Sequence, residues 1–89
     1  MGIFSKLERA AALSSEMADR VGVDISQELA TDPHLAAPRI RARVQRCAGC
    51  LKHRECAALL RSGLSISEAP EYCRNKEELD HLAMKIAAL

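Results

Sequence analysis

Apolar residues recur at helical spacing along most of the chain, and no stretch alternates apolar and polar residues over the length of a strand. Residues 3–21 form the first such stretch, which ends at Gly22, a residue that readily takes the positive φ of a helix C-terminus. A short turn capped by Asp24 is expected over residues 23–29. The apolar positions expected to face the core here are Ile3, Leu7, Ala10, Ala11, Met17, Val21, Val23, Ile25 and Leu29.

The middle of the chain predicts two more helices. The pair Asp32-Pro33 is typical of a helix start, an N-cap residue followed by proline at the first helical position. Pro38 is expected to break that start or to begin a second helix, which runs to about residue 47. Another helix is expected over residues 53–62. The positions of these helices expected to face inward are Ile40, Val44, Cys47, Cys56, Leu59 and Leu60.

The C-terminal part predicts a loop over residues 64–74 and a final helix. Asn75 is expected to cap that helix, with Glu78 three residues later completing a capping box. The side chains expected to hold the loop and the helix against the body are Leu64, Ile66, Tyr72, Leu79, Leu82, Ala83, Ile86 and Leu89. Together these patterns predict an all-α fold, a small bundle of about four helices around a four-cysteine metal centre, in one domain over residues 1–89.

A chain of 89 residues has a small hydrophobic core. A domain of this size buries only about 60–65% of the surface that its unfolded chain exposes. Apolar residues make up 48% of the chain, but its aromatic residues are only one Phe and one Tyr. Because such cores are marginal, small domains are commonly stabilised by disulfides, a metal or a partner. The four cysteines are the obvious candidates for that role.

The cysteines stand at Cys47, Cys50, Cys56 and Cys73, with the spacing C-x2-C-x5-C followed after sixteen residues by the last one. Four thiols are the number that holds one [4Fe-4S] cluster or one tetrahedral zinc ion. A cubane cluster can take ligands from separated positions, and this pattern has three ligands close together and one remote. Cys73 precedes the N-cap of the last predicted helix, so backbone N–H groups there can point at its sulfur. We therefore expect a [4Fe-4S] cluster bound by all four cysteines.

Three other interpretations of the cysteines are open. Structural Zn²⁺ would use all four, or His53 in place of one, but zinc sites typically show two tight ligand pairs and only Cys47 and Cys50 form one here. Disulfides need an oxidising compartment, and the charged N-terminal residues do not resemble a secretory signal. The thiols could also be buried without any ligand. Since no apolar run approaches the ~20 residues of a membrane span, a cytoplasmic protein with reduced thiols is expected.

Positive charge is concentrated beside the cysteines: residues 38–61 carry a net charge of +6, against −3 before them and −2 after them. The groups that could offset the negative charge of a cluster are Arg39, Arg41, Arg43, Arg46, Lys52 and Arg54. The arginine-rich helix could instead contact nucleic acid phosphates or form a solvated face, and no aromatic residues are interleaved for base stacking. His34, His53 and His81 are expected at the surface, and only His53 is close to the cysteines in sequence.

Two family resemblances bear on the cysteines. The stretch Arg46-Cys47-Ala48-Gly49-Cys50, with Cys56, resembles the end of the [4Fe-4S] loop in helix-hairpin-helix DNA glycosylases, whose last three cluster cysteines have the same spacing. The first cluster cysteine lies upstream in those enzymes, whereas here Cys73 must serve. Their hairpin and catalytic residues have no counterpart in this chain, so the resemblance implies the cluster and not the enzyme.

The chain as a whole is similar to a family of small bacterial four-cysteine proteins of unknown function. The similarity rests on Met17-Ala18-Asp19-Arg20, on the cysteine stretch, and on Ala69-Pro70-x-Tyr72-Cys73-x-Asn75. It implies that the four cysteines act as one set.

These observations predict a small iron–sulfur protein that transfers single electrons or senses redox state and has a protein redox partner. The chain is not expected to be an enzyme, because it shows no paired carboxylates, no evident nucleophile and no phosphate-binding loop. The alternative is a zinc-stabilised interaction module that could contact nucleic acid through the arginine-rich helix. No membrane association is expected, and the sequence leaves the oligomeric state open.

Overall fold

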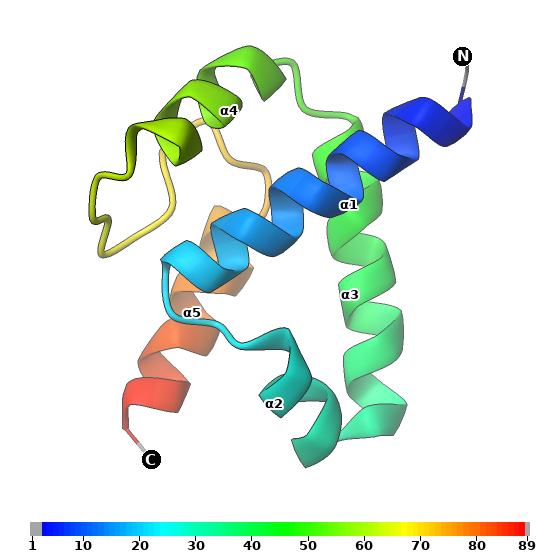
Figure 1. Ribbon diagram of the computed structural model, residues 1–89. Helices are drawn as coiled ribbons and strands as arrows, with labels where there is room; N and C mark the ends of the chain where they lie inside the picture. The colour runs from blue at the N-terminus through cyan, green and yellow to red at the C-terminus, as the bar shows by residue number, and fades with distance from the viewer. Residues whose placement is uncertain (1–2, 89) are drawn as a thin grey trace.

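The computed structural model describes residues 3–88 as five α-helices, with no strand in that range (Figure 1). The helices are α1 (Ile3–Arg20), α2 (Ile25–Thr31), α3 (Pro33–Ala48), α4 (His53–Ser62) and α5 (Lys76–Ala87). The all-α prediction is confirmed, and the helix beyond the four or so expected is α2, predicted as a short turn. Asp24 caps α2 as predicted, because its carboxylate accepts the backbone N–H groups of Ser26 and Gln27. In the described range no helix has the length and apolarity needed to cross a bilayer.

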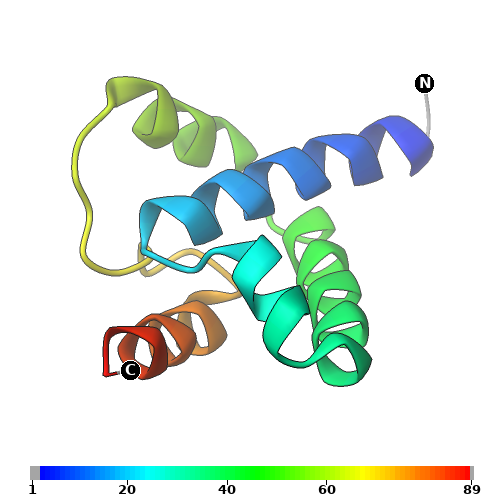
Figure 2. The same cartoon turned by 60° about the horizontal axis from the view of Figure 1, so that its bottom comes forward.

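α1 is the central helix of the fold. It lies between α4 on one side and α5 on the other (Figure 2). α3 crosses and contacts α1, and α2 packs on α3 (Figure 1). At the C-terminal end of α1, the Arg20 guanidinium donates to the carbonyl oxygens of Leu60 at 2.8 Å and Leu64 at 3.0 Å. These bonds fix the end of α4, and the loop that follows it, against the central helix.

The core is formed where α1 meets α4, α5 and the loop between them. Its buried members are Leu13, Met17, Ala18, Val21, Val23, Cys56, Leu60, Ala69, Leu79 and Leu82. The predicted core position of Ala11 is wrong, because the buried face of α1 runs through positions 10, 13, 14, 17, 18 and 21. Leu64 is 62% exposed, since the loop is held there by its backbone carbonyl rather than by its side chain. Leu89 and the side chain of Ile3 lie outside the described residues.

α3 is one continuous helix, so the predicted break at Pro38 is wrong. The predicted start is confirmed: Pro33 is the first helical residue, and the Asp32 carboxylate accepts the backbone N–H of Leu35 at 3.3 Å. Pro38 lies in the second turn, where it removes one backbone hydrogen bond. The helix continues past it, with Ala36 fully buried before Pro38 and Arg39 paired with Glu28 of α2 after it.

The arginines of α3 bind carboxylates on neighbouring helices. Arg43 is 1% exposed, so its predicted place on a solvated or cluster-facing surface is wrong. Its guanidinium donates to Glu28 of α2 at 2.9 Å and to Glu78 of α5 at 2.7 Å. Leu29, predicted to face the core, is 39% exposed, because the neighbouring Glu28 occupies the side of α2 that meets α3. We call this cluster the arginine network; its members are Glu28, Arg39, Arg43, Arg46, Asn75 and Glu78.

The predicted capping box at the start of α5 is also wrong. Asn75 occupies the N-cap position, but its side chain makes no capping bond. That side chain is buried and bonds Arg46, and the Glu78 carboxylate accepts from Arg43 and Arg46. Since these partners lie on α3, a pattern read from the residues of α5 alone could not reveal them.

Candidate metal centre

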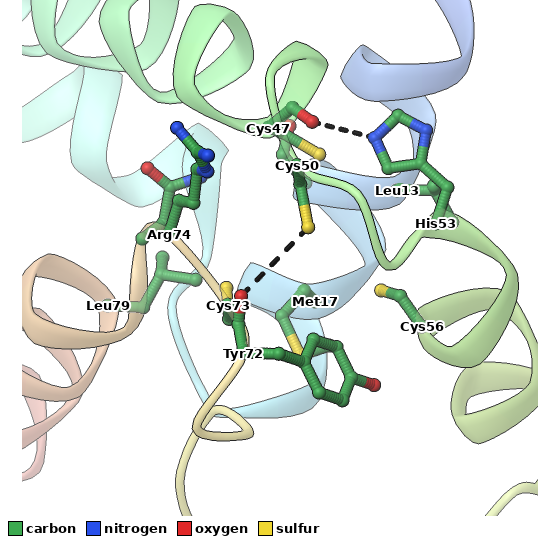
Figure 3. A pocket seen from close by; sticks show the side chains of 12 residues that line it. Leu13, Met17, Cys47, Cys50, His53, Cys56, Tyr72, Cys73, Arg74 and Leu79 are labelled. Carbon is green, nitrogen blue, oxygen red and sulfur yellow. Dashed lines mark hydrogen bonds between the residues drawn. The ribbon is translucent and has the colours of Figure 1, made fainter.

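All four cysteines line one pocket at the centre of the fold (Figure 3). Cys47 lies in the last turn of α3, and Cys50 lies in the loop that leads to α4. Cys56 lies in α4, and Cys73 lies in the loop just before α5. The fold therefore brings together four thiols that the sequence spreads over residues 47–73.

Backbone hydrogen bonds shape the chain around two of these sulfurs. The N–H of Lys52 donates to the Cys50 sulfur at 3.4 Å. At Cys73, burial raises the pKa of the thiol, and a backbone hydrogen bond from Asn75 partly offsets this effect. Such donors stabilise thiolates and tune the potential of a bound cluster.

The α3–α4 loop and the loop before α5 meet at the pocket. The Cys50 thiol donates to the carbonyl oxygen of Tyr72 at 3.9 Å (Figure 3). The N–H of Cys50 donates to the carbonyl of Cys47 at 3.0 Å, which closes the turn between the first two cysteines. The bond to Tyr72 therefore holds the segment that carries Cys73 close to Cys50.

The pocket disfavours the thiolate forms of Cys47 and Cys56. Burial, reinforced by repulsion from the other cysteines, raises the pKa of Cys47 to about 11. Burial and the charges of Cys73, Cys50 and Glu16 raise the pKa of Cys56 to about 11 as well. These thiols therefore keep their protons at neutral pH, and a bound cation would stabilise the thiolates that burial disfavours.

Apolar side chains and one cation complete the pocket wall. Leu13 and Met17 of α1 and Leu79 of α5 face the sulfurs and keep water away from them. The cavity between the side chains measures about 20 Å³, enough for about one water molecule. Arg74 is the cation of the lining, and the arginines of α3 expected to offset a cluster do not take part in it. Arg74 was not predicted as a pocket residue from the sequence, although its position directly after Cys73 could have indicated that role.

The sulfurs stand around the wall of the pocket rather than meeting at one point (Figure 3). Within residues 3–88, no three His, Cys, Asp or Glu side chains converge closely enough to hold a single metal ion. In this arrangement the thiols would have to move inward to bind one ion.

His53 is the histidine that the fold brings to the cysteines. It is half-buried and lines the pocket, whereas His34 and His81 are exposed as expected. Its Nε2 lies 2.6 Å from the carbonyl oxygen of Cys47. Because a carbonyl can only accept, Nε2 is the donor of this bond and is not free to bind a metal. Through this nitrogen His53 holds the end of α3.

Comparisons with known proteins identify the family to which the chain belongs. No curated protein and no solved structure matches it. One family matches residues 1–85, nearly the whole sequence, and the chain accordingly belongs to DUF6455, a family of unknown function.

Proposed function

We propose that the protein binds a [4Fe-4S] cluster through Cys47, Cys50, Cys56 and Cys73 and uses it to transfer single electrons or to sense redox state. The observation that carries this proposal is the convergence of all four cysteines on one pocket. A bound cluster would supply one-electron exchange at a potential set by its surroundings. The chain's own residues would hold the cluster, exclude water and balance its charge, with no catalytic residue required.

The residues present fit such a group in several respects. Sulfurs spread around a pocket suit a cubane, since each thiolate needs to reach only its own iron. The Cys50 sulfur already accepts a backbone N–H bond, and Arg74 provides positive charge at the wall. The loop's likeness to the glycosylase cluster loop, and the likeness to small bacterial four-cysteine proteins, support the same ligand set. On this proposal the protein is cytoplasmic and exchanges electrons with a protein partner.

Structural Zn²⁺ is the alternative, in a module that binds a partner without redox chemistry. The observation that favours it is the small cavity of about 20 Å³, which suits one ion better than a cluster of eight atoms. The nucleic acid contact proposed with it has less support, because Arg39, Arg43 and Arg46 are occupied by carboxylates. Arg41 remains exposed on that helix.

The metal content of protein purified without oxygen from iron-replete cells tests the proposal. We expect a brown protein with about four iron and four sulfide per chain. Replacing any one cysteine by serine, Cys73→Ser included, should remove or degrade the cluster, because the chain has no fifth thiol. His53→Ala should keep it. A colourless protein with one zinc per chain would refute the cluster and establish the alternative.

A further inference from the structure

Asn75 is a buried polar residue with an unusual set of partners. The residue is only 3% exposed. The amide nitrogen donates to the backbone carbonyl of Arg43 at 2.9 Å, and the amide oxygen accepts from the Arg46 guanidinium at 2.7 Å. Both halves of the amide are therefore bound to α3, across 32 and 29 residues of sequence.

These bonds belong to a tightly connected cluster. Arg46 also donates to Glu78 at 2.9 Å, so one guanidinium joins α3 to the first turns of α5 at two points. Arg43 adds a third bond between the two helices through the same carboxylate. In the described chain no buried side-chain nitrogen or oxygen lacks a partner. A fully satisfied network of this kind holds its members in one arrangement.

Asn75 also lines the cysteine pocket, two residues after Cys73. On the α3 side, Cys47 directly follows Arg46 and lies one helical turn after Arg43. Asn75 thus joins the segment carrying the remote cysteine to the segment carrying the first one.

We propose that Asn75 is a positioning residue that sets the place of Cys73 relative to Cys47, with Arg46 as its partner. This inference rests on the proposed metal function of the four cysteines. The remote ligand has sixteen residues between it and Cys56, so sequence proximity does not locate it. The side-chain amide anchors the segment that carries Cys73 on α3, next to Cys47. Residues that orient metal ligands in this way typically raise metal affinity about 10–100-fold.

A purely structural role would predict a different outcome. In that case, replacing Asn75 would weaken the metal only as far as it weakens the fold. The comparison variant is Leu82→Ala, which removes a buried side chain of α5 that does not line the cysteine pocket.

The test is the rate at which a chelator removes the metal from loaded protein, alongside unfolding by denaturant. We expect Asn75→Ala to release metal about tenfold or more faster than the wild type, with an altered absorption spectrum of the centre. Leu82→Ala should release it near the wild-type rate under conditions where both variants remain folded. Equal release rates and unchanged spectra for the two variants would overturn the proposal.

A second pair of variants covers the case in which Asn75→Ala does not fold. Arg46 is half-exposed, and Arg46→Lys keeps the charge while losing the fork that reaches Asn75 and Glu78 together. Release should accelerate severalfold in Arg46→Lys and stay unchanged in Arg41→Ala, which removes an exposed charge from the same helix. Wild-type release from Arg46→Lys would overturn the inference. Wild-type protein that takes up neither iron–sulfur cluster nor zinc would instead refute the proposed function.

Discussion

The arginine network and the cysteine pocket are two polar clusters in one small core, and they differ in how complete they are. In the network each charge has its counterpart, as the 1% exposed Arg43 between Glu28 and Glu78 illustrates. In the pocket, burial raises the pKa of the Cys47 and Cys56 thiols, and neighbouring cysteines raise it further. The chain therefore supplies the opposite charges of one cluster, whereas the other consists of four thiols in a largely apolar pocket, as the proposed metal site would require.

Breaking the network should have the largest effect on the fold. Arg43→Met leaves the carboxylates of Glu28 and Glu78 without their buried partner, and removing one side of a buried ion pair costs about 3–5 kcal/mol. The free energy of unfolding, measured by denaturant titration, should fall by that amount. Arg41→Ala, at an exposed position of the same helix, should stay within about 0.5 kcal/mol of the wild type. A cost below about 1 kcal/mol for Arg43→Met would contradict a stabilising network.

Removing the metal should have the next largest effect, and it should be local. A ligand present at a hundredfold excess over its Kd stabilises the folded state by about 2.7 kcal/mol. We expect the metal-free protein to melt at a lower temperature, with amide hydrogen exchange accelerating in α4 and the loop before α5. Exchange in α2 and the first turns of α3 should change least, because the network holds them. An identical melting temperature with and without metal would remove the distinction between the two clusters.

Raising the pH to just above 9 should produce the smallest effect, and this effect should come from the pocket. In the folded metal-free protein burial raises the pKa of Cys47 and Cys56 to about 11, from an ordinary value of 9.0. Between these values the unfolded chain loses protons that the folded chain keeps, so stability is full below pH 9 and falls as the pH rises toward 11. Denaturant titrations across this range should show a steeper decline for the wild type than for a Cys47→Ser, Cys56→Ser double variant. Parallel declines would contradict the raised values.

The sequence predicted the local features of this fold well. Helical spacing and the Asp24 and Asp32 caps indicated helices that the structure contains, because both signals depend on residues within one or two turns. The cysteine spacing likewise indicated a single set of thiols, and the fold places them in one pocket. That they bind a metal stays a prediction.

The features that sequence analysis missed depend on distant partners. Arg43 binds carboxylates 15 and 35 residues away, and no local pattern distinguishes it from an exposed arginine such as Arg41. Asn75 and Glu78 match a capping box in sequence, but the arginines of α3 compete successfully for their side chains. Tertiary contacts decided these positions against their local tendencies.

The central helix, α1, lines part of the pocket but carries none of the four cysteines. Leu13 and Met17 of α1 line the pocket, while every cysteine lies between residues 47 and 73. If the four cysteines bind a metal as proposed, the second half of the chain supplies all of its ligands, and α1 would act as the closure that separates it from water. The rate at which α1 detaches would set how long the protein keeps its metal. Slow hydrogen exchange in α1, matched to slow metal release, would reveal that shared step.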